Sequence, residues 1–514
     1  VADGNNVEAQ GSVAIGSGCD GGTASLKFSG GAAQSLNLTG VESIFNGDIE
    51  VAKSAETLTL GSALTMDAVG QDLTITSGTF STSGTNYGLT IAGDLLMNGG
   101  TTALNASTVA VTGTARLNGG SVTSSGGSMT AGTLQVTSGT YAQGTQVVTP
   151  TALVVDGGTF TGGGGSMTVG TVTLSSGTFT APSGTLSVSG AWTHTAGGTF
   201  THNSGTVGFT GSLATIDVAS TESFSALTIN KSGGQTLTIA SGDALVAAGV
   251  LTLTDGAFAT GSITAQGSIV VGASWDAAGS GAINATGTGI VTLDLSAGAG
   301  VLDNPLTVNK AGGSFTLASA YTLDHANADL TLTLGTFSTG GFTLTTSSGS
   351  DIALNGGTFN ASSATLTIAG GLTIAGATMN GNTSTGTISG AFLLSSGAYN
   401  GDTSTPTFSG GLTITGGVFT ASSGVTTVSG GWTHTAGGTF THNSGTVTFT
   451  GNSATIDVAT SETFSALTLN KTTGQTLTIA SGDTLVMVGT LTLTDGVADG
   501  NNVEAQGSVA IGSG

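Results

Sequence analysis

The sequence predicts an all-β chain that folds as a parallel β-solenoid, with about 20 residues per coil and no separate globular domain. Three observations lead to this class: apolar residues alternate with Thr and Ser, Gly recurs at regular offsets, and a large apolar residue returns once per coil. Gly is 90 of 514 residues and Pro only 4, which excludes collagen and Pro-rich linkers. The patterned apolar content of 38% excludes a disordered low-complexity chain.

The large apolar residue that follows a Gly defines the length of a coil. It occurs at Phe80, Tyr141, Phe160, Phe179, Phe200, Phe337, Phe359, Met379, Tyr399, Phe419 and Phe440. From Phe337 to Phe440 the steps are 22, 20, 20, 20 and 21 residues. Antiparallel β-sandwiches also have short strands and Gly-rich turns, but so regular a step favours a solenoid.

One coil contains three short strands and three corners. The stretch Gly411–Gly430 reads GLTITGGVFTASSGVTTVSG, in which LTI, VFT and TTV alternate between apolar and hydroxyl residues. β-branched Thr, Val and Ile suit extended backbone, and Gly and Ser suit the corners between strands. We expect Leu, Ile, Val and Phe to point inward and Thr and Ser outward, and we expect a right-handed coil from the crossover rule.

The chain is also repetitive on two longer scales. Residues 1–18 (VADGNNVEAQGSVAIGSG) recur unchanged as residues 497–514, which gives a period of 496 residues. Gly190–Gly211 recurs with two changes as Gly430–Gly451, 240 residues later. We therefore predict a first half-repeat at 1–255, a second at 256–496, and the start of the next tandem copy at 497–514. The unit of function is then expected to be a head-to-tail array of copies.

Charge and cysteine content exclude several classes of protein. Six Lys and Arg stand against 28 Asp and Glu, a net charge of −22, which disfavours binding to nucleic acid or to anionic lipid. An acidic excess keeps long fibres soluble and apart. Cys19 is the only cysteine, so an intrachain disulfide framework is excluded. We find no signal peptide and no apolar stretch long enough to span a membrane, so no membrane insertion is expected in this segment.

Two groups of residues are the candidates for a metal site. His194 and His202 recur as His434 and His442, but no Cys or nearby acid completes a ligand set, and we interpret them as polar positions of a duplicated coil. Asp243, Asp255, Asp483 and Asp495 lie in SGD and TDG corners, where stacked carboxylates could bind Ca²⁺. Asp also favours turns by bonding to its own backbone, and the calcium-binding nonapeptide pattern is absent. We predict no metal and no other cofactor, with Ca²⁺ as the alternative.

Two further functions are weighed against a structural one. A polysaccharide-active enzyme needs paired acids or a cationic base in a groove, whereas Arg116 is the only arginine and the lysines are far apart. The Lys residues that end the NK runs are expected to pack their stems and to leave their amines in solvent. An ice-binding face needs threonines aligned in almost every coil, and Thr-x-Thr pairs such as Thr57/Thr59 and Thr331/Thr333 drift along the coil. We therefore predict that the protein is not an enzyme and disfavour ice binding.

The runs ALTINKSGGQTLTIASGD, LTLTDG, GGTFT and GWTHTAGGTFTHNSGTVTFTG resemble repeats of large secreted bacterial β-helix proteins. These are adhesins of the filamentous-haemagglutinin type and surface proteins similar to autotransporter passengers. The resemblance covers most of the chain and implies secretion, an extracellular or cell-surface location and a long β-helix shaft. We predict a structural filament or surface fibre of tandem copies, with the shaft of an adhesin as the alternative and with cell surfaces or glycans as further partners.

Overall fold

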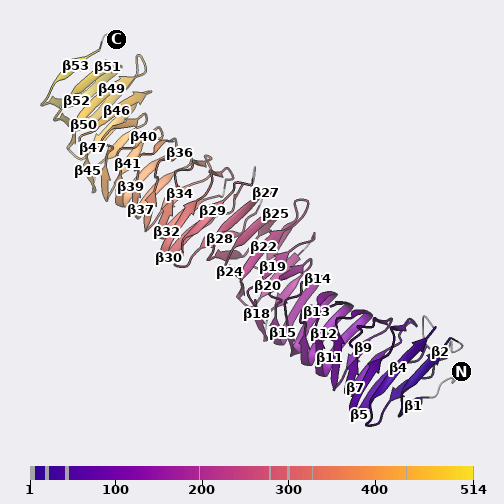
Figure 1. Ribbon diagram of the computed structural model, residues 1–514. Helices are drawn as coiled ribbons and strands as arrows, with labels where there is room; N and C mark the ends of the chain where they lie inside the picture. The colour runs from indigo at the N-terminus through magenta and orange to yellow at the C-terminus, as the bar shows by residue number, and fades with distance from the viewer. Residues whose placement is uncertain are drawn as a thin grey trace. The chain divides into compact units, whose positions relative to one another are not determined.

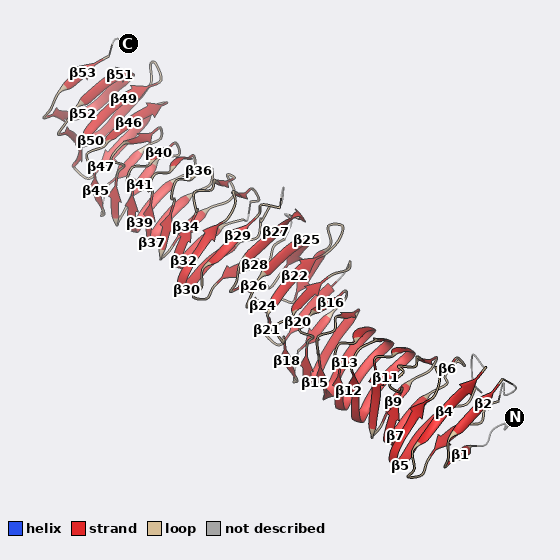
Figure 2. Cartoon of the chain, in the orientation of Figure 1, coloured by secondary structure: helices blue, strands red, loops and turns tan. Residues whose placement is uncertain are grey.

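The computed structural model describes residues 6–17, 22–40, 46–195, 197–212, 214–276, 279–297, 301–326, 328–435 and 437–512. Cys19 lies outside these residues. The chain forms two compact units, unit 1 (Val1–Ala248) and unit 2 (Gly249–Gly514). The predicted half-repeat boundaries at residue 255 and at residue 496 stay a prediction. Figure 2 shows strands and loops and no helix in the described part of the chain.

Unit 1 contains the first 24 strands of the chain as labelled here. They are β1 Val7–Ala9, β2 Val13–Gly16, β3 Leu26–Phe28, β4 Gln34–Thr39, β5 Ile49–Leu60, β6 Leu64–Met66, β7 Leu73–Ser81, β8 Leu89–Ile91, β9 Leu95–Met97, β10 Thr101–Asn105, β11 Thr108–Ser124, β12 Ser128–Ala142, β13 Val147–Thr161, β14 Met167–Val169, β15 Thr171–Thr180, β16 Thr185–Val188, β17 Trp192–His194, β18 Thr199–Thr201, β19 Thr206–Phe209, β20 Ala214–Val218, β21 Thr221–Phe224, β22 Ala226–Asn230, β23 Thr236–Ile239 and β24 Ala244–Ala247.

Unit 2 contains the remaining strands. They are β25 Leu251–Ala259, β26 Ser262–Ala265, β27 Ile269–Trp275, β28 Ala282–Ala285, β29 Val291–Asp294, β30 Leu306–Leu317, β31 Tyr321–Leu323, β32 Leu330–Ser338, β33 Leu344–Thr346, β34 Ile352–Leu354, β35 Thr358–Asn360, β36 Thr365–Ile368, β37 Leu372–Asn380, β38 Thr385–Ile388, β39 Phe392–Asn400, β40 Thr405–Phe408, β41 Leu412–Ile414, β42 Val418–Thr420, β43 Val425–Val428, β44 Trp432–His434, β45 Thr439–Thr441, β46 Thr446–Gly451, β47 Ala454–Val458, β48 Ser461–Phe464, β49 Ala466–Lys471, β50 Thr476–Met487, β51 Leu491–Asp495, β52 Val497–Ala505 and β53 Val509–Ile511.

Within each unit, the described strand pairs are parallel and join strands of successive coils. In unit 1, β11, β12, β13 and β15 follow one another side by side, as Figure 1 shows. In unit 2, ten strands form one parallel sheet in the order β31-β33-β36-β38-β40-β43-β46-β49-β51-β53, which we call sheet B. The prediction of a parallel β-solenoid with about 20 residues per turn is confirmed.

The column of large apolar residues predicted from the sequence forms the core of both units. In unit 2, Phe337 pairs with Phe359, and the same register continues through Met379, Tyr399 and Phe419 to Phe440. The rings of Phe337 and Phe359 stack with centroids 5.1 Å apart. In unit 1 the column runs through Tyr141, Phe160, Phe179 and Phe200. Burial of these rings supplies the apolar driving force that the short strands need.

Polar side chains form ladders where the coil turns. Asn400 donates its amide to Asn380, at 2.9 Å, and Asn380 donates to Asn360, at 2.8 Å. Asn382 and Asp402 hold positive φ angles of 51° and 48°, which Asn and Asp tolerate better than other residues with a Cβ. Because Asn stands at the same position in successive coils, each Asn side chain hydrogen-bonds to the Asn of the neighbouring coil.

Candidate functional site

The most elaborate polar arrangement in unit 1 joins a histidine, a glutamate and a tryptophan. Nδ1 of His194 lies 2.7 Å from Oε2 of Glu222, and Nε2 lies 2.9 Å from the carbonyl oxygen of Gly197. Trp192 donates its indole N–H to the same Glu222 oxygen at 3.3 Å. Because a carbonyl and an ionised carboxylate only accept, Nε2 donates to Gly197 and Nδ1 donates to Glu222. Both ring nitrogens are thus engaged, and this arrangement leaves neither of them for a metal.

Unit 2 repeats the histidine–glutamate pair and its contact with a glycine carbonyl. Nδ1 of His434 lies 2.7 Å from Oε2 of Glu462, and Nε2 lies 3.0 Å from the carbonyl oxygen of Gly437. Burial raises the pKa of Glu462, and the hydrogen bond from His434 offsets only part of that effect. Trp432, buried beside them, packs edge-to-face on Phe440 with ring centroids 4.9 Å apart. The site is held by an aromatic cluster and does not open on a described groove.

No described hydrogen bond joins His202 to His194, or His442 to His434. Nδ1 of His202 accepts the backbone N–H of Ser204 at 3.2 Å, and His442 accepts that of Ser444 at 3.1 Å. Within the described residues, no group of three or more His, Cys, Asp or Glu side chains is placed to hold a metal ion. His202 and His442 each stabilise a tight turn, one in each unit.

The aspartates proposed for Ca²⁺ are placed separately, and three of them accept local hydrogen bonds. Asp243 accepts the backbone N–H of Val218 at 2.9 Å, and Asp483 accepts that of Val458 at 2.8 Å. Their carboxylates therefore satisfy donors of the preceding coil. Asp495 accepts the hydroxyl of Thr473 and the N–H of Gly496, and Asp255 is half-buried in β25. Only Asp495 bonds to the backbone next to it, as Asp does in turns, whereas Asp243 and Asp483 join their coil to the one before.

The lysines of the NK runs differ from the expectation that their amines face solvent. Lys231, Lys310 and Lys471 are at most 1% exposed, and so is Lys53. Nζ of Lys231 donates to the carbonyl of Thr210 at 2.7 Å, one coil earlier. Burial lowers the pKa of Lys231, Lys310 and Lys471. Each amine donates to at least one backbone carbonyl of the coil before, and these hydrogen bonds compensate for its burial.

A ladder of aspartates was missed from the sequence. Asp48 accepts the backbone N–H of Asp72 at 2.9 Å, Asp72 accepts that of Asp94 at 2.7 Å, and Asp94 accepts that of Thr114 at 2.7 Å. Burial raises the pKa of Asp72, with the neighbouring acids adding to it. The signal was an Asp directly before an Ile or Leu that opens a strand, in GDIEV, QDLTI and GDLLM. Each carboxylate ties one coil to the next.

Unit 2 contains a buried acid whose proton affinity is altered. Asp303 is 2% exposed, and burial together with the neighbouring Asp324 raises its pKa to about 6. Its Oδ1 accepts the backbone N–H of Asp324 at 3.3 Å. A carboxyl of this kind exchanges its proton near neutral pH, as a general acid does.

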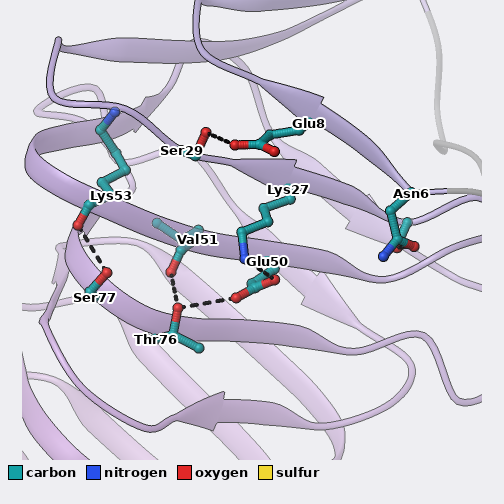
Figure 3. A network of polar contacts seen from close by, with 10 residues as sticks. Asn6, Glu8, Lys27, Ser29, Glu50, Val51, Lys53, Thr76 and Ser77 are labelled. Atoms are coloured by element: carbon teal, nitrogen blue, oxygen red, sulfur yellow. Dashed lines mark hydrogen bonds and ion pairs between the residues drawn. The ribbon is translucent and has the colours of Figure 1, made fainter.

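Opposite charges alternate on successive coils near the start of unit 1. β1 places Glu8 opposite Lys27 of β3, and β3 places Lys27 opposite Glu50 of β5. Lys27 and Glu50 form an ion pair at 3.1 Å, and the hydroxyl of Ser29 donates to Glu8 at 2.6 Å. Figure 3 shows Glu50 between Lys27 and Thr76, whose hydroxyl donates to Glu50 at 3.2 Å. Acidic and basic side chains therefore alternate along this row, and a coil that placed a like charge opposite its neighbour would be destabilising.

The last described coil of unit 2 has an apolar pocket of about 330 Å³. Leu485, Met487, Leu491 and Leu493 of β50 and β51 line it, together with Val503 and Val509 of β52 and β53. Val503 is 42% exposed and Val509 is 53% exposed. The pocket is the end of the solenoid core and not a cleft with convergent polar groups.

No protein-family model, no curated protein and no solved structure matches the chain. The resemblance to filamentous-haemagglutinin-type adhesins and autotransporter passengers therefore stays a prediction, although the β-solenoid that it implies is present. The described part of the chain has no helix that could cross a membrane.

Proposed function

We propose that the protein is structural, and that tandem copies of its 496-residue β-solenoid form an extracellular filament or surface fibre. The observation that supports this proposal most directly is the duplicated eighteen-residue segment. One copy of the segment pairs with the coil that follows it, and the other copy pairs with the coil that precedes it. The two sets of pairs are compatible in register.

The register can be followed residue by residue. Val7 pairs with Leu26 of the following coil, and β2 pairs with β4. Val503, the same residue of the second copy, pairs with Leu485 of the preceding coil, and β53 pairs with β51. One segment thus has a partner for each of its two edges. In a tandem array a single copy of it would use both edges at once and would leave no unpaired strand.

Charge favours a shared segment over the stacking of separate chains. A shared segment places Glu504, which is the equivalent of Glu8, opposite Lys27 of the next copy. Stacking the last coil of one chain on the first coil of another would place Glu504 opposite Glu8 instead. Like charges directly opposite each other on parallel strands are destabilising, so continuous copies are the favoured arrangement.

Apolar exposure at the last coil supports the same arrangement. Ile511 is 79% exposed, whereas Ile15, its equivalent in the first copy of the segment, is 7% exposed. A following copy would cover Ile511 and its neighbours, because the coil containing Leu36 and Leu38 packs on Ile15. Burying this surface is favourable by roughly 25 cal/mol per Å².

The shaft of a cell-surface adhesin is the alternative function. It would use the same solenoid, and its binding tip would lie in another part of the protein. The filament is preferred because the duplicated segment provides a junction between copies, which a single shaft does not need. Under this proposal the protein acts mechanically and is not an enzyme: continuous backbone ladders and a dry interior resist extension and proteolysis.

The test compares a chain of two tandem copies with the 514-residue chain by hydrogen exchange. We expect residues 497–511 to exchange rapidly in the single chain and to be protected when a second copy follows. Electron microscopy should show one continuous particle of twice the length, with a spacing of about 4.8 Å along its axis. Two beads joined by an unprotected junction would contradict the proposal.

The substitution Val503→Asp tests the junction, because its effect in the single chain serves as the control for its effect in the two-copy chain. In the single chain Val503 is 42% exposed in the lining of the apolar pocket, so the substitution should destabilise this chain less than the two-copy chain. In the two-copy chain the same side chain would be buried between coils, and the junction should lose its protection. An equal effect in both chains would show that the segment is not a junction.

A further inference from the structure

A row of threonines runs along the outer face of sheet B, one on each of nine successive strands. The register of the strands places them at one position of the coil: Thr322, Thr345, Thr367, Thr387, Thr407, Thr427, Thr448, Thr468 and Thr492. All nine side chains reach the surface, because none of them is buried. The Thr-x-Thr pairs named from the sequence lie elsewhere, on strands such as β5 and β32.

A second row accompanies the first on the same face. Thr365, Thr385 and Thr405 pair in register two residues before Thr367, Thr387 and Thr407. Val425, which is 42% exposed, holds this position on the next strand, and Thr446 pairs with it. The hydroxyls of Thr365 and Thr385 lie 3.5 Å apart. Neighbouring strands are about 4.8 Å apart and alternate residues about 6.6 Å apart, so the threonine positions form a two-dimensional lattice.

The lattice is uncharged. Strands β36, β38, β40, β43 and β46 contain no Asp, Glu, Lys or Arg, although the whole chain has a net charge of −22. Between Asp351 and Asp457 the sequence has one such residue, Asp402. A face that binds ions, nucleic acid or a charged protein surface would carry charge of the opposite sign.

The strands of sheet B expose no aromatic ring, although Phe342, two residues before β33, is 41% exposed. The rings of Tyr321, Phe408 and Phe449 in sheet B are 0% exposed and form the core beneath the threonines. Stacking on exposed aromatic rings is therefore not available to hold a sugar ring. The face offers methyl groups and hydroxyls only, at fixed positions.

We propose that this two-row threonine face of sheet B binds ice. Its lattice of hydroxyls repeats at distances of the size found between water molecules on an ice surface, and its methyl groups favour ordered water between the rows. Thr is β-branched and has few rotamers, and the buried core under sheet B holds the backbone, so little conformational entropy is lost on binding. The ligand class is solid water, and no charged or aromatic contact is required.

Unit 1 provides an internal comparison. Its corresponding rows run through Thr65, Thr90, Ala110, Thr130 and Thr149 and through Thr168, Ser187, Gly208 and Thr228. Ala110 and Gly208 interrupt them, and Gly208 takes the place that Thr448 has 240 residues later. Ice binding is therefore expected from the face in unit 2.

The test uses the complete single chain, so its outcome does not depend on the proposed filament. Thermal hysteresis and inhibition of ice recrystallisation are measured for the protein and for the triple variant Thr367→Leu, Thr387→Leu, Thr407→Leu. We expect activity in the protein and a loss of roughly tenfold or more in the variant, since each misplaced side chain breaks the lattice. Circular dichroism and the unfolding midpoint show whether the variant is folded.

The matched control is Thr373→Leu, Thr413→Leu, Thr433→Leu, on outward positions of β37, β41 and β44 in the other sheet. It should keep the activity within about twofold, because it adds the same apolar area away from the face. No activity above that of an equal mass of albumin would overturn the proposal, as would a fully active triple variant on sheet B. Lateral association of chains that only the sheet B variant abolishes, without any effect on ice, would identify the face as a contact between copies and would also overturn it.

Discussion

His434 and Glu462 lie 2.7 Å apart through Nδ1 and Oε2, and His194 and Glu222 repeat the contact at the same distance 240 residues earlier. The two glutamate side chains are both 8% exposed. A buried carboxylate with one strong donor depends on that donor, because water does not replace it. The pair therefore stabilises the fold, and its removal is the first prediction.

His434→Leu should destabilise unit 2 by about 1–3 kcal/mol at pH 7. The variant leaves the Glu462 carboxylate buried without its donor. Because burial already holds the pKa of Glu462 above its usual 4.5, this group stabilises the fold fully below that value and loses the contribution as pH rises through its folded pKa. The cost of the variant should therefore shrink at pH 4. Chemical denaturation at both pH values measures it.

His442→Leu is the control for that experiment. Its ring accepts one backbone N–H of a turn and contacts no buried acid in the hydrogen bonds described. We expect a change of at most about 0.5 kcal/mol, similar at both pH values. A pH-independent cost for His434→Leu as well would show that the Glu462 carboxyl is not ionised in the folded chain.

Asp303→Asn should stabilise unit 2 increasingly as pH rises. The folded pKa of Asp303 is about 6, above the usual 3.8, so its contribution is fully present below pH 3.8 and is lost as pH rises through about 6. Asparagine keeps the acceptor for the N–H of Asp324 and removes the buried charge. We expect a gain of about 1–2 kcal/mol at pH 8 and none at pH 3.5, measured as the free energy of unfolding.

Asp294→Asn should show the opposite sign. Hydrogen bonds from Ser296 hold the pKa of Asp294 below its usual value, so this carboxylate stabilises the fold above pH 3.8 and loses the contribution as pH falls. The variant should be less stable than the protein at pH 8 and equal to it at low pH. Parallel pH profiles for both variants would refute the assignment of the two environments.

Lys471→Met should cost about 1–3 kcal/mol, because two buried carbonyls lose a donor. Nζ of Lys471 donates to Thr450 at 2.9 Å and to Asn452 at 2.7 Å. Burial lowers the pKa of Lys471, so its contribution is fully present above pH 10.5 and falls as pH falls through the folded pKa. The deficit of the variant should be larger at pH 10.5 than at pH 7. Lys27→Met, which breaks only an exposed ion pair, should cost less than about 1 kcal/mol.

The coil length and the aromatic column could be predicted from the sequence because both are periodic signals in one strand of the coil. The step from Phe337 to Phe359 and on to Phe440 fixed the register of that strand, and the pairs of the structure follow it. The same step also places the threonine row of sheet B. Thr345, Thr367 and Thr387 lie eight residues after Phe337, Phe359 and Met379, and the same offset holds as far as Thr448, so this row could be predicted from the sequence as well.

The buried amines could not be predicted for a different reason. The partner of Lys231 is the carbonyl of Thr210, and a backbone carbonyl leaves no mark in the sequence. Only the position of the next coil decides whether that carbonyl meets water or a lysine. The partner of His194 is likewise Glu222, 28 residues away, and nothing local in the sequence joins them.

Gly78→Ala should destabilise unit 1 more than Gly70→Ala does, although both glycines have a positive φ, of 78° and 75°. A Cβ on Gly78 would lie 2.6 Å from Cβ of Lys53, in the coil before, whereas a Cβ on Gly70 meets nothing within 4 Å. Gly70→Ala should cost only the backbone strain of about 1–2 kcal/mol. Gly78→Ala should add to this the displacement of a lysine whose Nζ donates to the carbonyl of Ala32 at 2.7 Å. Equal unfolding midpoints for the two variants would mean that Lys53 moves freely and that its buried hydrogen bonds contribute little to the fold.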